Sequence, residues 1–202
     1  MSFTVIRSHE ICAGHRVVGH ESKCRHLHGH NYVFHFHVAA NQTHRHRKDG
    51  FVPTDLDDVG RVIDFSVVKS TLCEWLENNW DHRFLHWEKD ELIRGFIGLV
   101  ENDNRDGFVP RDQVDHLYNS FVELPFNPTA ENLAQYMVEV IGPRLLDEHG
   151  VELVQCVIEE TSKCHVSYVK TPTVDVAKIT SVIQNSVNYL TTEIAHLKGR
   201  VK

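Results

Sequence analysis

The chain has 202 residues, of which 41% are hydrophobic and 24% charged, enough for one buried globular core with additional segments. No apolar run approaches the roughly 18 residues that a membrane-spanning helix needs, and the start lacks the basic-then-apolar pattern of a secretory signal. We therefore expect a cytoplasmic protein without a membrane partner. The net charge of -7 gives no electrostatic reason to bind nucleic acid, because phosphate neutralisation requires a basic surface.

The cysteines indicate free thiols and not a disulfide framework. They are odd in number, thinly spread and without a CxxC pair, which is unlike a stapled secreted fold. The five positions are Cys12, Cys24, Cys73, Cys156 and Cys164.

The first half of the chain predicts two strands and a helix. Residues 2–18 and 29–40 are expected to pair as an antiparallel hairpin with a long loop, since the second segment is rich in aromatic and β-branched residues. Residues 41–60 are polar and predict an exposed loop, and residues 62–65 lead into a helix. The apolar stripe of that helix comprises Val67, Val68, Thr71, Leu72, Trp75 and Leu76.

The second half predicts a helix, a second hairpin and a helical tail. Residues 86–123 are long for a connection and predict short helical pieces. Capping residues at 127–129 begin the next helix, and residues 151–159 and 163–170 predict the second hairpin. The tail, residues 171–202, has apolar residues at helical spacing. The apolar face of the second helix comprises Leu133, Met137, Val140 and Ile141.

Histidine is concentrated at the start of the chain, where ten of the sixteen fall within the first 46 residues. This bias indicates metal binding or proton-transfer chemistry. The ten are His9, His15, His20, His26, His28, His30, His35, His37, His44 and His46.

Three of these histidines have the spacing of a metal site. If residues 28–30 belong to a strand, His28 and His30 point to the same face, because side chains alternate with period two. His15 on the paired strand would supply a third nitrogen and leave a fourth position open, as catalytic zinc requires. A single histidine is more often simply hydrogen-bonded than a ligand, so the hypothesis depends on the spaced set. His35 and His37 also share a face, but no further partner is indicated.

Three further positions carry candidate chemistry. Cys24, four residues before His28, could lie beside the metal as a thiolate base without being a ligand, or be a buried structural cysteine. Asp81 and His82 are a carboxylate beside an imidazole, which is a possible proton relay. Glu160 at a strand end could bind a ring bearing adjacent amino and imino donors, or be a solvated charge.

Taken together, these segments resemble the 6-pyruvoyl/6-carboxytetrahydropterin synthase family over about residues 3–170. They occur in the family's order, and within them three residues separate Cys24 from the His-Gly-His motif. The matching segments are Ala-Gly-His15, Cys24-x-x-x-His28-Gly29-His30, Val62-Ile63-Asp64-Phe65, Asp81-His82, Asn127-Pro128-Thr129-Ala130-Glu131-Asn132 and Glu160-Thr161.

The resemblance implies an α+β tunnelling fold (ββααββ), a four-stranded antiparallel sheet with two helices on one face. Residues 1–170 would form this domain, interrupted by an insertion at about 86–123 and followed by a C-terminal helical extension over 171–202. The family also implies homo-oligomers, typically hexamers, whose sheets close into a barrel with active sites at subunit interfaces.

By resemblance, His15, His28 and His30 bind Zn²⁺, Cys24 abstracts a proton, Asp81 and His82 form a second acid/base element, and Glu160 anchors the pterin ring. The implied reaction converts 7,8-dihydroneopterin triphosphate to 6-carboxy-5,6,7,8-tetrahydropterin with loss of triphosphate and acetaldehyde.

The product is implied by the spacing between Cys24 and His-Gly-His alone. Three intervening residues resemble the bacterial 6-carboxytetrahydropterin synthases of the 7-deazaguanine (queuosine) route, whereas the pyruvoyl-forming enzymes of animals resemble a longer spacing. The alternatives are a 6-pyruvoyltetrahydropterin synthase, a pterin side-chain aldolase, and a non-catalytic zinc-binding protein, which would leave Asp81, His82 and Glu160 unexplained.

Overall fold

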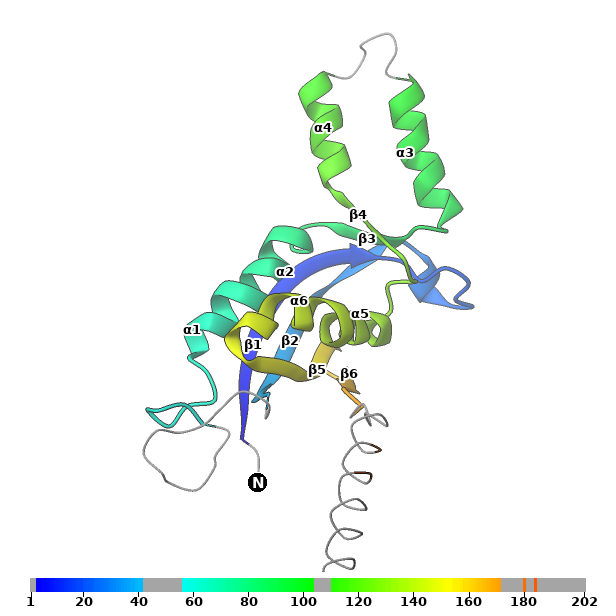
Figure 1. Cartoon of the computed structure of the whole chain (residues 1–202). Coiled ribbons are helices and arrows are strands. Elements are labelled where there is room, and N and C mark those ends of the chain that lie inside the picture. Colours follow the sequence, from blue (N-terminus) through cyan, green and yellow to red (C-terminus); the bar gives the residue numbers. More distant parts are fainter. Residues whose placement is uncertain (1–2, 42–55, 104–109, 172–179, 181–183, 185–202) are drawn as a thin grey trace, which may run out of the picture. The chain divides into compact units, whose positions relative to one another are not determined.

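A computed structural model describes residues 3–41, 56–103, 110–171, 180 and 184 of the chain (Figure 1). The chain divides into two compact units, Met1–Lys170 and Thr171–Lys202. The helix predicted over 171–202 lies almost entirely outside the described residues, so the division into a domain and a helical extension remains a prediction. Within the described ranges, no helix combines the length and apolarity needed to cross a membrane.

The centre of the first unit is an antiparallel arrangement of four strands. β1 (Thr4–His15) pairs with β2 (His28–Ala40), β2 pairs with β5 (Val151–Thr161), and β5 pairs with β6 (Cys164–Val169). Both predicted hairpins and the four-stranded antiparallel sheet of the α+β tunnelling fold are confirmed.

Two short parallel strands extend this sheet beyond the prediction. β3 (Phe84–Trp87) pairs with β1 at Gly14 and His15, and β4 (Phe121–Leu124) pairs with β3. The sheet therefore has six strands in the order β4-β3-β1-β2-β5-β6. Each added strand has four residues, which is too short for an alternating pattern to predict it.

Two helical segments cover one face of the sheet (Figure 1). The Asp64 carboxylate accepts the N–H of Ser66 at the start of the first segment, and Thr129 accepts the N–H of Asn132 at the start of the second. The first segment comprises α1 (Phe65–Val68), a π-helical turn (Lys69–Cys73) and α2 (Glu74–Asn79). The second comprises α5 (Ala130–Tyr136), a π-helical turn (Met137–Ile141), α6 (Gly142–Leu146) and a final 3-10 turn (Asp147–His149).

The core lies between the helices and the sheet. Alternate residues of β2 (Tyr32, Phe34, Phe36 and Val38) are fully buried in one cluster with both helical segments, and this burial is the main stabilising term for the fold. The predicted apolar stripe of the second helix is wrong at Val140, which is 45% exposed. The π-helical turn adds a residue there, so Val138 faces the core in addition to the predicted Met137 and Ile141, and Val140 turns outward.

The insertion forms two helices between β3 and β4. α3 (Glu91–Asp103) and α4 (Arg111–Asn119) lie next to each other beyond this edge of the sheet (Figure 1). These helices confirm the helical pieces predicted for residues 86–123, although both ends of that stretch belong to strands. The buried Asp90 accepts the N–H groups of Leu92 and Ile93. Its other oxygen lies 3.1 Å from Nε of Arg16, which connects the base of the insertion to the residue that follows β1.

Candidate metal centre and active site

Three histidines meet at the end of the first hairpin. The register places His15 opposite His28, and His30 opposite Ala13, so all three side chains lie on the helix-facing side of the sheet. Their ring centroids are 4.4 to 5.2 Å apart. One nitrogen from each ring lies within 4.8 Å of the other two, so the group could hold a metal ion. Among the described residues, no other group of three such side chains meets this criterion.

The ring orientations suit metal binding. Nδ1 of His15 lies 2.7 Å from the Pro128 carbonyl oxygen, and Nδ1 of His28 lies 2.8 Å from the His26 carbonyl oxygen. A carbonyl oxygen only accepts, so both Nδ1 atoms carry the proton and each Nε2 keeps a free lone pair. Nε2 of His15 is buried without a hydrogen-bond partner, an arrangement that a bound cation would complete.

The environment of His15 and His30 favours their neutral forms. Burial lowers the pKa of His15 to about 4, helped by His28 and His30 and opposed by the hydrogen bond to Pro128. Burial also lowers the pKa of His30, where the carboxylate of Glu160 opposes the shift. Neutral imidazoles are the metal-binding form, so protons compete weakly for these two rings near neutral pH.

In the metal-free protein this shift should make stability depend on pH. Between pH 6.5 and about 4 the unfolded chain protonates His15 while the folded chain does not, so stability falls as the pH falls. The loss attributable to His15 should be about 2 kcal/mol between about pH 7 and about pH 5. Denaturant unfolding of the metal-free wild type and of His15→Gln measures it. Equal changes in the free energy of unfolding for the two proteins would contradict the assignment.

Glu160 faces the same cluster from β5. Its Oε1 lies 3.6 Å from Nε2 of His15 and 3.7 Å from Nε2 of His30. The same oxygen accepts from the hydroxyl of the buried Tyr32 at 3.5 Å. Burial, followed by the charge of Glu160, raises the pKa of Tyr32, so its hydroxyl remains a donor. This bond leaves one carboxylate oxygen of Glu160 without a protein donor in the described residues.

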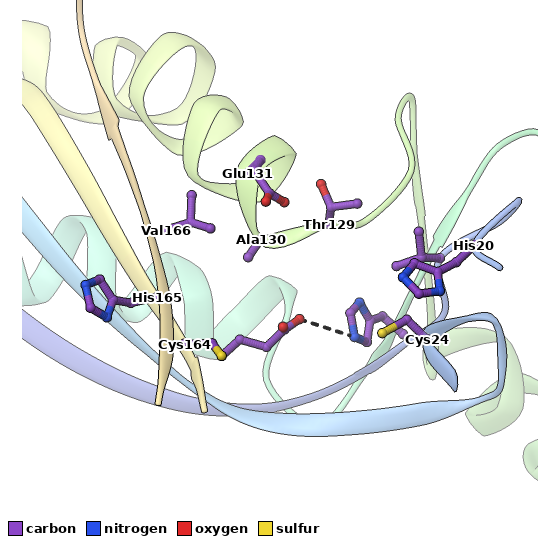
Figure 2. A pocket seen from close by; sticks show the side chains of 11 residues that line it. His20, Cys24, Thr129, Ala130, Glu131, Cys164, His165 and Val166 are labelled. Carbon is purple, nitrogen blue, oxygen red and sulfur yellow. Dashed lines mark ion pairs between the residues drawn. The ribbon is translucent and has the colours of Figure 1, made fainter. Parts of the chain in front are cut away.

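A cavity of about 350 Å³ lies beside the histidines. Cys24 reaches it from a 3-10 turn (Lys23–Arg25), and the N-terminal end of α5 forms another wall (Figure 2). The dashed contact in Figure 2 joins His15 and Glu160. The structure therefore brings His15, Cys24 and Glu160 to one cavity. The cavity is also lined by residues for which the sequence predicted no role: Val17, His20, Thr129, Ala130, Glu131, Cys164, His165 and Val166.

Asp81 and His82 occupy a different place in the subunit. Asp81 accepts the N–H of Cys12, and its other oxygen lies 3.8 Å from Nε2 of His82. His82 is 82% exposed, adopts a positive φ of 54°, and lines a second cavity that also touches His28 and His30. Neither residue lines the cavity that contains Cys24.

His35 and His37 do not form a second metal group in the described part of the chain. Nδ1 of His35 lies 2.7 Å from Oγ of Ser8, and Nε2 lies 2.7 Å from Oε1 of Glu159. Both ring nitrogens of His35 are therefore already engaged in hydrogen bonds on the face of the sheet opposite the helices.

The fold and the site define a tunnelling-fold protein with a three-histidine group that could bind a metal. The chain belongs to the 6-pyruvoyl tetrahydropterin synthase family, whose model it matches over residues 4–171.

Individual relatives agree with this assignment. The 6-carboxy-5,6,7,8-tetrahydropterin synthase of Rickettsia typhi is 32% identical over 76% of this chain and 91% of its own. An uncharacterized protein from Wolinella succinogenes has the same fold, with a TM-score of 0.64 and 22% identity over 85% of this chain and 99% of its own. The 6-pyruvoyl tetrahydropterin synthase of Plasmodium vivax gives a TM-score of 0.51 at 18% identity, over 85% and 99% of the two chains.

Proposed function

We propose that this chain is a zinc-dependent lyase that converts 7,8-dihydroneopterin triphosphate to 6-carboxy-5,6,7,8-tetrahydropterin, releasing triphosphate and acetaldehyde, in 7-deazaguanine (queuosine) biosynthesis. The observation that carries the proposal is the convergence of His15, Cys24 and Glu160 on one cavity beside the three-histidine group. The relative from Rickettsia typhi, named as a 6-carboxytetrahydropterin synthase, favours the carboxy product over the pyruvoyl product.

The metal would be held by His15, His28 and His30. Their nitrogen donors and an open fourth position suit zinc, which when bound supplies Lewis acidity toward side-chain oxygens of the substrate. The hydrogen bonds from Nδ1 of His15 and His28 fix both rings, so the chain presents two oriented Nε2 donors before any metal arrives.

Cys24 is the proposed proton acceptor. Its thiolate would take a proton from the substrate side chain at the cavity wall, a general-base role that does not require metal ligation.

Asp81 and His82 are the proposed second acid/base element, acting at another subunit's site. His82 lines the other cavity, with the Asp81 carboxylate 3.8 Å from its Nε2, and the exposed imidazole could reach across a subunit contact. This assignment requires a homo-oligomer, for which the family resemblance favours a hexamer.

Glu160 is the proposed anchor for the pterin ring. A carboxylate can accept two parallel N–H bonds from adjacent amino and imino groups, and Tyr32 orients one of its oxygens. Glu160→Ala should raise the Michaelis constant by about 10-fold or more while zinc is retained, since a lost charge-assisted hydrogen bond costs about 1.5 to 3 kcal/mol. Steady-state kinetics and metal analysis measure both effects.

Glu159→Ala is the matched control, because the neighbouring carboxylate contacts His35 on the opposite face of the sheet. Its Michaelis constant should stay at the wild-type value. An unchanged Michaelis constant in Glu160→Ala would contradict the role of Glu160 in binding the pterin ring. Loss of zinc in that variant would indicate that Glu160 is a metal ligand.

The experiment that tests the whole proposal is incubation of the zinc-loaded protein with 7,8-dihydroneopterin triphosphate, followed by mass spectrometry of the products. The carboxy product with acetaldehyde supports the proposal. A 6-pyruvoyl product would identify the alternative synthase, and metal content without turnover would favour a zinc-binding protein.

A further inference from the structure

We propose that Asn127 is a positioning residue that holds the loop carrying Cys24 in place relative to the three-histidine group. The inference rests on the proposed function in one respect, the role of Cys24 as the proton acceptor. It assigns to Asn127 a task that neither metal binding nor ring binding requires.

The side chain of Asn127 forms two hydrogen bonds with the backbone of Val18. Its Oδ1 accepts the N–H of Val18 at 2.9 Å, and its Nδ2 donates to the carbonyl oxygen of Val18 at 2.8 Å. A primary amide offers one acceptor and one donor, and so matches the backbone N–H and C=O of a single residue, as a neighbouring strand would. Aspartate has the same shape but no donor.

Together with the ion pair between Arg16 and Asp90, this pair of hydrogen bonds anchors the loop between β1 and β2 to distant parts of the chain. In residues 3–41 and the other described ranges, the remaining hydrogen bonds of residues 17–26 join only residues of the loop or the adjoining His28. One of them runs from the N–H of Val17 to the carbonyl oxygen of Cys24 at 2.7 Å. Asn127 therefore fixes Val18, and the residue next to Val18 fixes Cys24.

The same segment also orients a metal-binding residue. Pro128, which follows Asn127, accepts the Nδ1 proton of His15. The Asn127 carbonyl oxygen accepts from Nδ2 of Asn132 at 2.9 Å, which fastens the segment to the first turn of α5. Two consecutive residues thus set the distance between the Cys24 thiol and the Nε2 atom of His15. A general base must lie within hydrogen-bond reach of its proton, and a displacement of about 1 Å can cost up to about 100-fold in rate.

The test is Asn127→Asp in the full-length, zinc-loaded protein. The new carboxylate places an oxygen against the Val18 carbonyl oxygen, so one bond is replaced by repulsion. The turnover number should fall by about 10- to 100-fold, with zinc content and the Michaelis constant within about twofold of wild type. Asn127→Ala, which removes both bonds without adding a charge, should also lower the turnover number. Gln155→Glu is the control, because that amide donates to Oγ of Ser167 on the opposite face of the sheet.

Two further readouts do not need turnover. Cys24 should react with iodoacetamide at a changed rate in Asn127→Asp, and the amides of residues 17–26 should exchange hydrogen faster while the core stays protected. If the wild type proves inactive on the proposed substrate, these readouts still decide the inference. Unchanged turnover and unchanged alkylation would overturn it, and so would uniform loss of protection, which would show a general structural role.

Discussion

Replacing Cys24 with alanine should abolish most turnover and leave the metal in place. The three imidazoles come from β1 and β2 and do not involve the sulfur, so zinc content should stay near the wild-type value. General-base catalysis commonly contributes about 10²- to 10⁴-fold, and the turnover number should fall within this range. Residual activity would come from the metal and from binding of the substrate. Metal analysis and steady-state kinetics on the same preparation measure both quantities.

Cys164→Ser is the informative companion variant, because Cys164 lines the same cavity from the start of β6. It should keep nearly full activity. Loss of turnover in Cys164→Ser alone would reassign the base to that thiol. Loss of zinc in Cys24→Ala would indicate that Cys24 is a metal ligand. Retention of both zinc and activity would indicate that another residue accepts the proton, with His82 the next candidate.

The hairpin that carries the histidines was predictable because its signals are local. Aromatic residues occupy the alternate positions 32, 34 and 36, and three of the four residues flanking them (Asn31, His35 and His37) are polar, which indicates the face of β2 that enters the core. His28 and His30 continue the same alternation, so the three-histidine group lies on the face of β2 that also enters the core. His15 then needed only the antiparallel pairing to join them.

The rest of the cavity was not predictable because it is assembled from distant segments. His20, Thr129 and Cys164 come from the β1–β2 loop, the N-cap of α5 and the start of β6, which meet only in the folded chain. The hydrogen bonds between Asn127 and Val18 likewise join residues 109 positions apart. The family resemblance implies that Asp81 and His82 act at the same active site as Cys24, whereas within this chain neither lines the cavity that contains Cys24 and His82 lines a separate one.

Removing either of the β2 imidazoles should empty the metal site. With His28→Ala or His30→Ala, two nitrogen donors remain, fewer than the three protein ligands of known catalytic zinc sites. We expect the wild type to bind about one zinc per subunit, and each variant to retain well under half of that after dialysis against metal-free buffer. Turnover should fall with the metal, because the same ion would polarise the substrate.

His35→Ala is the matched control for this loss, since it removes a histidine from the same strand without touching the cluster. Its ring contacts Ser8 and Glu159 on the other face of the sheet, so zinc should remain at the wild-type level. Elemental analysis of the three variants separates a specific site from general binding by a histidine-rich chain, which would lose a little zinc in each. Near-normal zinc in both His28→Ala and His30→Ala would contradict the proposed metal site. The proposed reaction could then not depend on a metal held by these imidazoles.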